Sequence, residues 1–323
     1  MMRHKLRVLI FWALFIPAVA PPVAVFSESE CTGWALQGEC ATNPHFMMAS
    51  CRRHCLKHEM EVRRYQRRCP APADHKPALT PGAMHHTFDR IMRDFEHLEP
   101  EMLSAEPPVV LFNSFASDDE ISAFLKHGAG HYERSRALEV DKTGHLSEVT
   151  TSYRTSSHAW CSSNECVNDP MVKKVSERVA NVTQTPEANA EDVMLLYYHA
   201  CKSAGNNRED SDCALYRQHS DFLPADKYKL QGVRIYTLNV FLNDVEEGGA
   251  TSFTNLPSNP VSVQARRGKA ILWPSVLADD PNAEDLRAQH EALPVTKGEK
   301  FGAMYWIHQY DFKTSLAKGC TAD

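Results

Sequence analysis

The sequence predicts an α+β protein: a double-stranded β-helix (jelly roll) buttressed by helices, preceded by a small disulfide-rich module. Helical spacing of apolar residues dominates the middle of the chain, and strand-like runs follow beyond Asp192. Helices first and many strands afterwards are typical of such folds. Four cysteines crowd residues 31–55. At 323 residues, the chain is long enough for one sizeable core and a small appendage.

Residues 1–27 predict a secretory signal peptide or a signal anchor, because three basic residues precede an apolar run over 8–26. Prolines interrupt this run and disfavour a stable spanning helix, which favours cleavage. A proline also follows the small residues 18–20, which makes cleavage there awkward. Both alternatives place the rest of the chain in the secretory pathway, in the lumen of the endoplasmic reticulum or Golgi. A retained anchor would make it a single-pass type II membrane protein.

Ten cysteines suit an oxidising compartment, where an even number can pair. Tight spacing predicts two short disulfides, Cys161 with Cys166 and Cys201 with Cys213. Cys69 and Cys320 remain, by elimination, for a bond between the linker and the C-terminal tail. Zinc binding is the competing interpretation, and the lack of paired C-x-x-C units disfavours it.

The charge balance bears on partners. A net charge of -6 and a pI near 6.2 argue against nucleic acid as the main partner. A basic cluster within residues 63–68 is predicted to be a solvated face of a linker. Asn181 begins an Asn-Val-Thr sequon and is predicted to carry a glycan, provided that it is exposed.

Residues 56–108 predict a proline-rich linker between the module and the main domain. From Cys69 onwards this stretch contains seven prolines, and such density is typical of linkers. One helix is expected within it, over residues 88–95, where apolar side chains recur at helical spacing.

The main domain is predicted over residues 109–323. A short apolar strand covers 109–112, and Ser117 is expected to cap a helix that runs through Leu125. A second helix is expected from about Pro170. The strands predicted after Asp192 cover residues 193–199, 233–242, 269–273 and 301–310.

The last of these strands has two distinct faces. Phe301, Ala303, Tyr305 and Ile307 form an apolar face that is expected to pack on the helices. The other face, made by Lys300, Gly302, Met304, Trp306 and His308, is expected to point into the barrel. A buried ammonium group requires an anionic partner. Lys300 is therefore predicted to bind a carboxylate of a ligand.

His219 and Asp221 lie two positions apart in a strand-like run, which places their side chains on one face. His290, on a later strand, would complete a set of two histidines and one carboxylate, which leaves open positions on an iron(II) ion. The competing interpretation is ordinary surface or core histidines. Lys300, ten residues past His290, would anchor the acid tail of a co-substrate, so the pattern predicts an iron oxygenase.

The ordered motifs resemble the prolyl 4-hydroxylase family of 2-oxoglutarate- and iron(II)-dependent dioxygenases. Besides His219, Asp221, His290 and Lys300, they comprise residues 234–243, 246–251, 267–273, 294–295 and 306–308. The resemblance covers about residue 109 to the C-terminus. It implies iron(II) on the two histidines and Asp221, with 2-oxoglutarate and O2 as co-substrates and ascorbate as a reductant. It further implies that Lys300, Thr251 and Tyr198 bind the 2-oxoglutarate, which is converted to succinate and carbon dioxide.

The resemblance also implies a peptide substrate. The positions that match the family's peptide groove are Tyr216, Arg234, Trp306 and His308. Such aromatic and cationic side chains suit an extended chain with proline rings and peptide carbonyls. We therefore expect hydroxylation of peptidyl proline, at the 4-position, in secreted proline-rich or collagen-like proteins. Ala250 replaces the acidic residue that usually precedes Thr251, and Phe301 replaces a Trp, so substrate preference can differ from that of the family.

The cysteines at residues 31–55 resemble those of a ShK toxin-type (ShKT) module, with the first and last of the usual six absent. The resemblance implies bonds from Cys31 to Cys51 and from Cys40 to Cys55. So small a unit would depend on its disulfides. It would either bind a peptide or cell-wall ligand or act as a stabilising cap.

Three alternatives to a prolyl hydroxylase remain at this stage. A related oxygenase could act on another residue, such as lysine, with the same ligands and a different groove. A catalytically silent peptide-binding protein would be expected to lose a metal ligand, and none is missing. A zinc hydrolase with the same three ligands would have no use for Lys300.

Overall fold

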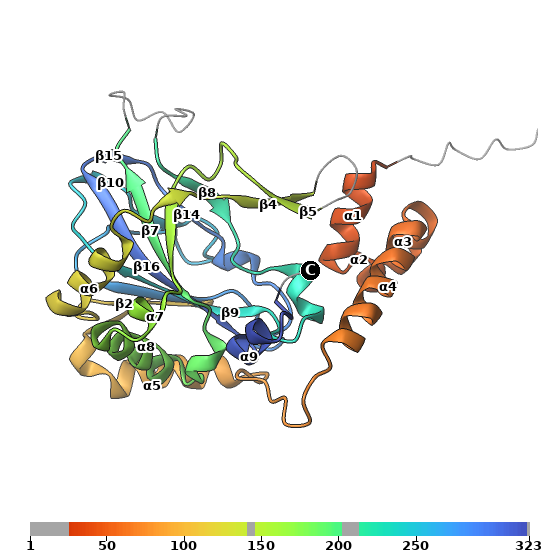
Figure 1. The fold of residues 1–323 in the computed structure, drawn as a ribbon, viewed down its shortest axis with the longest axis horizontal. Helices are drawn as coiled ribbons and strands as arrows, with labels where there is room; N and C mark the ends of the chain where they lie inside the picture. Colours follow the sequence, from red (N-terminus) through yellow and green to blue (C-terminus); the bar gives the residue numbers. More distant parts are fainter. Residues whose placement is uncertain (1–25, 141–145, 202–212, 322–323) are drawn as a thin grey trace, which may run out of the picture.

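The computed structural model describes residues 26–140, 146–201 and 213–321 (Figure 1). The predicted targeting segment, 1–27, lies outside these residues except for its last two. Among the helices described, none combines the length and the apolar character needed to cross a membrane.

The main domain is built on two antiparallel sheets. The larger has the order β1-β2-β13-β9-β16-β7-β6-β3, and the smaller has the order β12-β11-β14-β8. Two-stranded ribbons, β10-β15 and β4-β5, flank them. The strands of the larger sheet are β1 (Pro100–Ala105), β2 (Pro108–Phe112), β3 (Glu133–Arg134), β6 (Ser157–Cys161), β7 (Val193–His199), β9 (Arg234–Phe241), β13 (Ala270–Pro274) and β16 (Glu299–His308). The other strands are β4 (Ala137–Val140), β5 (Leu146–Val149), β8 (Tyr216–His219), β10 (Glu247–Gly248), β11 (Thr251–Phe253), β12 (Val261–Val263), β14 (His290–Ala292) and β15 (Val295–Lys297).

This arrangement confirms the predicted α+β jelly roll with helical buttresses. The strands predicted after Asp192 correspond to β7, β9, β13 and β16, with ends shifted by at most two residues. Helices cover the outer face of the larger sheet (Figure 1). They are α5 (Ala83–Asp94), α6 (Asp118–Gly128), α7 (Asn164–Val167) and α8 (Pro170–Thr183). The short 3-10 helices are η1 (Glu96–Leu98), η2 (Glu187–Asn189), η3 (Pro224–Tyr228) and η4 (Leu286–Ala288), and α9 (Phe312–Ala317) ends the described chain.

The two faces of β16 separate two cores, as the alternation of its side chains predicted. Ala303, Tyr305 and Ile307 are buried against the helices. Trp306 instead joins the apolar cluster between the two sheets. The helical layer is set by local sequence signals, since Ser117 caps α6 through a capping box with Glu120. Burial on both faces thus fixes the register of β16.

A small helical module precedes this domain. It comprises α1 (Glu28–Gln37), α2 (Glu39–Thr42), α3 (Pro44–Ser50) and the start of α4 (Arg52–Arg68). Its core holds the Cys31–Cys51 and Cys40–Cys55 disulfides together with Ala35 and Met47. A third disulfide joins Cys69, at the end of α4, to Cys320. The remaining described bonds are Cys161–Cys166 and Cys201–Cys213, so all five pairs are those that the sequence predicted.

The prediction of a linker over 56–108 is wrong for most of that range. Helix α4 continues through it to Arg68. Farther on, α5, η1 and β1 belong to the main domain, where Phe88, Ile91 and Leu98 are buried in the helical core. The helix expected over 88–95 is present as α5. The prolines at 100, 107 and 108 bound the strands β1 and β2 rather than forming an extended spacer.

Candidate active site

Strand register brings the three predicted metal ligands together. His290 opens β14 and lies directly across from His219, the last residue of β8. Asp221 follows two residues later, just beyond the strand end, where its carboxylate turns toward both rings. Its oxygens lie 3.8 Å from Nε2 of His219 and 3.6 Å from Nε2 of His290. All three ligand atoms lie within 4.8 Å of one another.

Hydrogen bonds orient these side chains for a cation. Nδ1 of His219 donates to the carbonyl of Arg217 over 2.8 Å, and Nδ1 of His290 donates to the carbonyl of Ala288 over 3.3 Å. Both Nε2 lone pairs are therefore left facing Asp221, and Nε2 of His290 is buried with no hydrogen-bond partner among the described residues. Such backbone acceptors behind the rings are typical of metal-binding histidines.

The electrostatic environment of His219, Asp221 and His290 favours binding of a metal ion over protonation of the two rings. Burial lowers the pKa of His290 and, together with the neighbouring His290, lowers the pKa of His219. Both rings are therefore neutral near pH 7, with lone pairs to offer. Asp221 accepts a 2.7 Å hydrogen bond from the hydroxyl of Thr237, which fixes its carboxylate. Two neutral imidazoles and one carboxylate fit an iron(II) ion with positions left for other ligands.

Lys300 lies across the same pocket, fully buried at 2% exposure. Its register partner is Tyr198, whose ring lies 5.2 Å from the ammonium, and Nζ donates over 3.4 Å to the hydroxyl of Thr251. Burial lowers the pKa of Lys300 to about 7. Among the described residues, no carboxylate forms an ion pair with it. An anionic ligand would stabilise this ammonium, so Lys300, Thr251 and Tyr198 are grouped as the sequence predicted.

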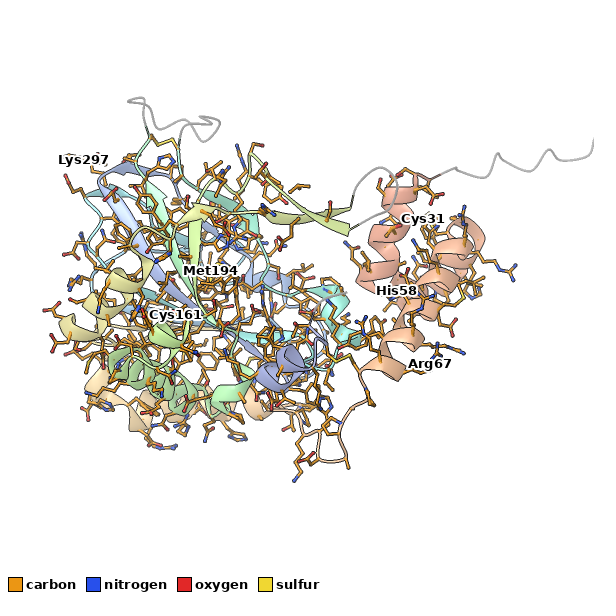
Figure 2. The ribbon with its side chains drawn as sticks, in the orientation of Figure 1. Cys31, His58, Arg67, Cys161, Met194 and Lys297 are labelled. Atoms are coloured by element: carbon orange, nitrogen blue, oxygen red, sulfur yellow. A yellow bond between two sulfur atoms is a disulfide. The ribbon has the colours of Figure 1, made fainter. Side chains whose placement is uncertain are left out.

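Aromatic and sulfur-containing side chains complete the pocket. Tyr216 stacks on His219, with ring centroids 3.4 Å apart, and the guanidinium of Arg154 lies over the Tyr216 ring, 4.8 Å from its centroid. Arg154 also donates to the sulfur of Met194, which lies near the centre of the domain in Figure 2. Trp306 lines the pocket with its indole Nε1 unsatisfied among the described residues. A water molecule or a hydrogen-bonding ligand would satisfy that group.

Two predicted groove residues are placed differently. His308 is 1% exposed and does not line the pocket. The register of β16 on β9 shifts between Ile307 and His308, as at a β-bulge, so the alternation that holds from Lys300 to Trp306 stops there. Arg234 also lies outside the pocket lining, and its guanidinium sits 3.7 Å above the ring of Trp306.

Both displaced residues bind an acid that the sequence patterns did not indicate. Oε1 of Glu191 accepts hydrogen bonds from Arg234 over 2.6 Å and from His308 over 2.8 Å. Burial alone would raise the pKa of Glu191, but Arg234 and His308 lower it to about 2. Thr237, the partner of Asp221, and Asn239, which lines the pocket, were likewise not singled out.

Comparison with known proteins agrees with this geometry. Residues 210–308 match the 2OG-Fe(II) oxygenase superfamily. Over 245 residues the chain is 30% identical to probable prolyl 4-hydroxylase 7 of Arabidopsis thaliana. The alignment covers 70% of this chain and 71% of that protein. The chain belongs to the prolyl 4-hydroxylase family. The chain is accordingly a 2-oxoglutarate- and iron(II)-dependent dioxygenase.

Longer prolyl 4-hydroxylases match as well. Identity is 28% over 212 residues to prolyl 4-hydroxylase subunit alpha-2 of Caenorhabditis elegans and 29% over 209 residues to subunit alpha-1 of Homo sapiens. The chain spans only 36% and 35% of those subunits. A solved structure, the viral collagen prolyl hydroxylase of Paramecium Bursaria Chlorella virus-1 with 2OG, has 22% identity and a TM-score of 0.42. The match covers 62% of this chain and 95% of that one.

Proposed function

We propose that this dioxygenase hydroxylates the 4-position of proline within secreted proline-rich or collagen-like polypeptides. One observation carries the proposal. A buried cation, Lys300, faces a neutral two-histidine, one-carboxylate set inside a single pocket. A zinc hydrolase would have no use for a buried lysine there, whereas a 2-oxo diacid requires both a metal chelate and a distal cation. The aromatic wall formed by Tyr216 and Trp306 suits a pyrrolidine ring.

Each side chain of the pocket has a defined role in this proposal. His219, Asp221 and His290 would hold iron(II), and Lys300 with the hydroxyls of Thr251 and Tyr198 would hold the far carboxylate of 2-oxoglutarate. When bound, these groups and O2 supply an oxidant that replaces a C–H hydrogen with a hydroxyl group, leaving succinate and carbon dioxide. The apolar and aromatic walls exclude water from that chemistry. Ascorbate is proposed as the reductant that keeps the iron in the iron(II) state.

The disulfides support the proposed location. Five disulfides among the described residues suit an oxidising compartment such as the lumen of the endoplasmic reticulum or Golgi. Asn181, the proposed glycan acceptor, is exposed near the end of α8. The ShKT-like nature of the module is proposed as well.

The test is turnover of 2-oxoglutarate with iron(II) and synthetic peptides. Peptides should be proline-rich, collagen-like, or matched with lysine or alanine in place of proline. Succinate is quantified, and mass spectrometry locates any added oxygen. We expect one succinate per hydroxyproline, and loss of both products in His219→Ala. Oxygen added to lysine alone would replace the substrate and keep the chemistry. No succinate from protein with bound iron would leave a silent peptide-binding protein.

A further inference from the structure

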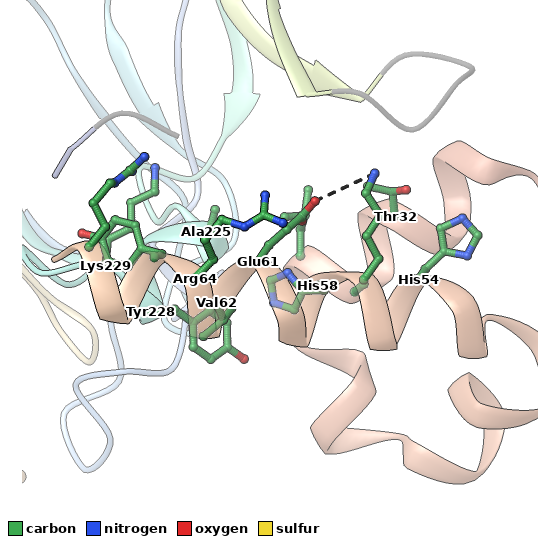
Figure 3. Close-up of a pocket in the computed structure, with 14 residues that line it drawn as sticks. Thr32, His54, His58, Glu61, Val62, Arg64, Ala225, Tyr228 and Lys229 are labelled. Carbon is green, nitrogen blue, oxygen red and sulfur yellow. Dashed lines mark ion pairs between the residues drawn. The ribbon is translucent and has the colours of Figure 1, made fainter. Parts of the chain in front are cut away.

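A second cavity lies between the helical module and the main domain (Figure 3). Its volume is about 380 Å³. Helices α1 and α4 form one wall, and η3 with the following Lys229 forms the other. The Cys69–Cys320 disulfide and Tyr65 hold these walls together, since the Tyr65 hydroxyl donates to the carbonyl of Cys320 and accepts from the amide of Leu230. We call this cavity the intermodule cleft.

The intermodule cleft has a local surplus of positive charge. Lys57, Glu61, Arg64 and Arg68 line it from one face of α4, because their spacing of three or four residues follows the helical repeat. Lys229 adds a cation from the opposite wall. Glu61 is the single acid in the lining, although the chain as a whole carries a net charge of -6.

Part of this charge has no counter-ion within the described chain. Lys57 lies 4.0 Å from Glu61, and Lys229 pairs with Asp226. Arg64 forms no ion pair with any described carboxylate, and Figure 3 shows it among the residues that line the cleft. The basic cluster at residues 63–68 is exposed, as the sequence predicted, although it lies on helix α4 rather than in a linker, and Arg64 and Arg68 within it line the cleft.

The lining also combines apolar surface with an unsatisfied polar atom. Leu36, Val62 and Ala225 contribute aliphatic surface, and the ring of His58 packs edge-on against Tyr228 at 5.3 Å. Nε2 of His58 is buried without a hydrogen-bond partner among the described residues. A peptide offers apolar side chains, carbonyl oxygens and carboxylates together, and so matches this mixed lining. A sulfated polysaccharide would instead favour an open and wholly cationic surface.

The cleft is tied closely to the active site along the chain. Lys229, in the wall of the cleft, lies eight positions after Asp221, a proposed metal ligand. An extended chain advances at most about 3.6 Å per residue, so these two residues lie within about 29 Å of each other. A substrate of roughly nine extended residues can span that distance. One polypeptide could therefore occupy both sites, and tethering would raise the effective concentration of its second segment.

We propose that the intermodule cleft binds an acidic segment of the polypeptide substrate, displaced along the chain from the target proline. That the bound peptide is a substrate rests on the function proposed above, whereas binding of an acidic peptide to the cleft does not. Carboxylates of the segment would pair with Lys57, Arg64 and Lys229, while its backbone and apolar side chains would pack on the lining. The helical module thereby acts as a selector of substrates rather than as a passive cap.

The first arm of the test measures binding without turnover. A fluorescent, proline-free peptide rich in glutamate is titrated into the full chain by polarisation, with a glutamine-substituted peptide for comparison. We expect Arg64→Glu and Lys57→Glu each to weaken binding of the acidic peptide by about threefold or more. Arg67→Glu, which makes the same charge change on α4 outside the cleft, should leave the dissociation constant unchanged. Added salt should weaken wild-type binding.

The second arm measures KM on proline peptides that carry an acidic or a glutamine segment about eight residues from the proline. We expect a lower KM for the acidic peptide in wild type and in Arg67→Glu, and no such advantage in Arg64→Glu. Equal binding of the acidic peptide by Arg64→Glu and Arg67→Glu would overturn the proposal. So would binding of a sulfated polysaccharide without binding of the peptide. Failure of hydroxylation with intact binding would overturn the proposed function alone.

Discussion

The Oε1 atom of Glu191 accepts a 2.6 Å hydrogen bond from Nε of Arg234, beneath the aromatic wall of the active site. The same oxygen accepts a bond from Nε2 of His308, whose Nδ1 faces the carbonyl of Gly232 at 2.7 Å. The His308 ring is therefore held between a carboxylate and a backbone carbonyl. Because Arg234 lies on the ring of Trp306, and the amide of Glu191 donates to the Trp306 carbonyl over 3.0 Å, Glu191 helps to position this pocket residue.

Substitution Glu191→Gln should destabilise the fold and weaken peptide binding. Removing the carboxylate leaves the buried guanidinium of Arg234 without its ion-pair partner, and we expect the free energy of unfolding to fall by about 3 kcal/mol. The KM for a proline peptide should rise more than kcat falls, since Trp306 loses its support. Urea unfolding and steady-state kinetics check this. Glu187→Gln, at an exposed acid on the neighbouring η2, is the matched control and should change neither.

Because of the same carboxylate, we expect the free energy of unfolding to fall at acid pH. The pKa of Glu191 is about 2 in the folded chain and 4.5 in the unfolded chain. Its stabilising contribution is therefore complete above pH 4.5 and is lost as the pH falls toward 2. Glu191→Gln should show a smaller loss of stability than wild type over this window, measured by urea unfolding at fixed pH values. Parallel curves for the two proteins would refute the paired-carboxylate assignment.

Lys300→Met should produce a more stable protein that no longer binds 2-oxoglutarate. The folded pKa of Lys300, about 7, lies below its ordinary value of 10.5. The cost of burying the ammonium is therefore full below pH 7 and fades as the pH rises toward 10.5. Metal-free wild type should gain up to about 5 kcal/mol of unfolding free energy over this window from this group, and Lys300→Met should lack that gain.

Calorimetric titration with 2-oxoglutarate tests the loss of ligand binding in Lys300→Met. A variant that still binds the diacid with wild-type affinity would disprove the anchor.

Thr237→Val should weaken iron binding with little effect on the fold. The Thr237 hydroxyl holds Oδ2 of Asp221 at 2.7 Å, and valine keeps the shape without the donor. Partners of this kind typically change metal affinity by about 10- to 100-fold. Equilibrium dialysis against iron(II) measures the change. Thr87→Val, a buried threonine on α5 outside the pocket, serves as the control for loss of a hydroxyl.

The comparison of prediction with structure shows which features local patterns can reveal. Alternation placed Lys300 and Trp306 in the pocket because β16 is regular up to that point. It failed at His308, where the pairing register shifts. Glu191 gave no signal, since its partners lie 43 and 117 residues away and meet it only through sheet pairing. Proline density suggested a linker because composition does not distinguish prolines that bound strands from prolines in a spacer.

Anaerobic binding of iron(II) and 2-oxoglutarate to the full chain tests the central claim most directly. Equilibrium dialysis and calorimetry should give one iron per chain, with tight 2-oxoglutarate binding only when iron is present. His219→Ala should lose both, whereas Lys300→Met should keep the iron and lose the 2-oxoglutarate. Iron bound equally well by His219→Ala, or 2-oxoglutarate bound without iron and without Lys300, would contradict the assignment of this pocket.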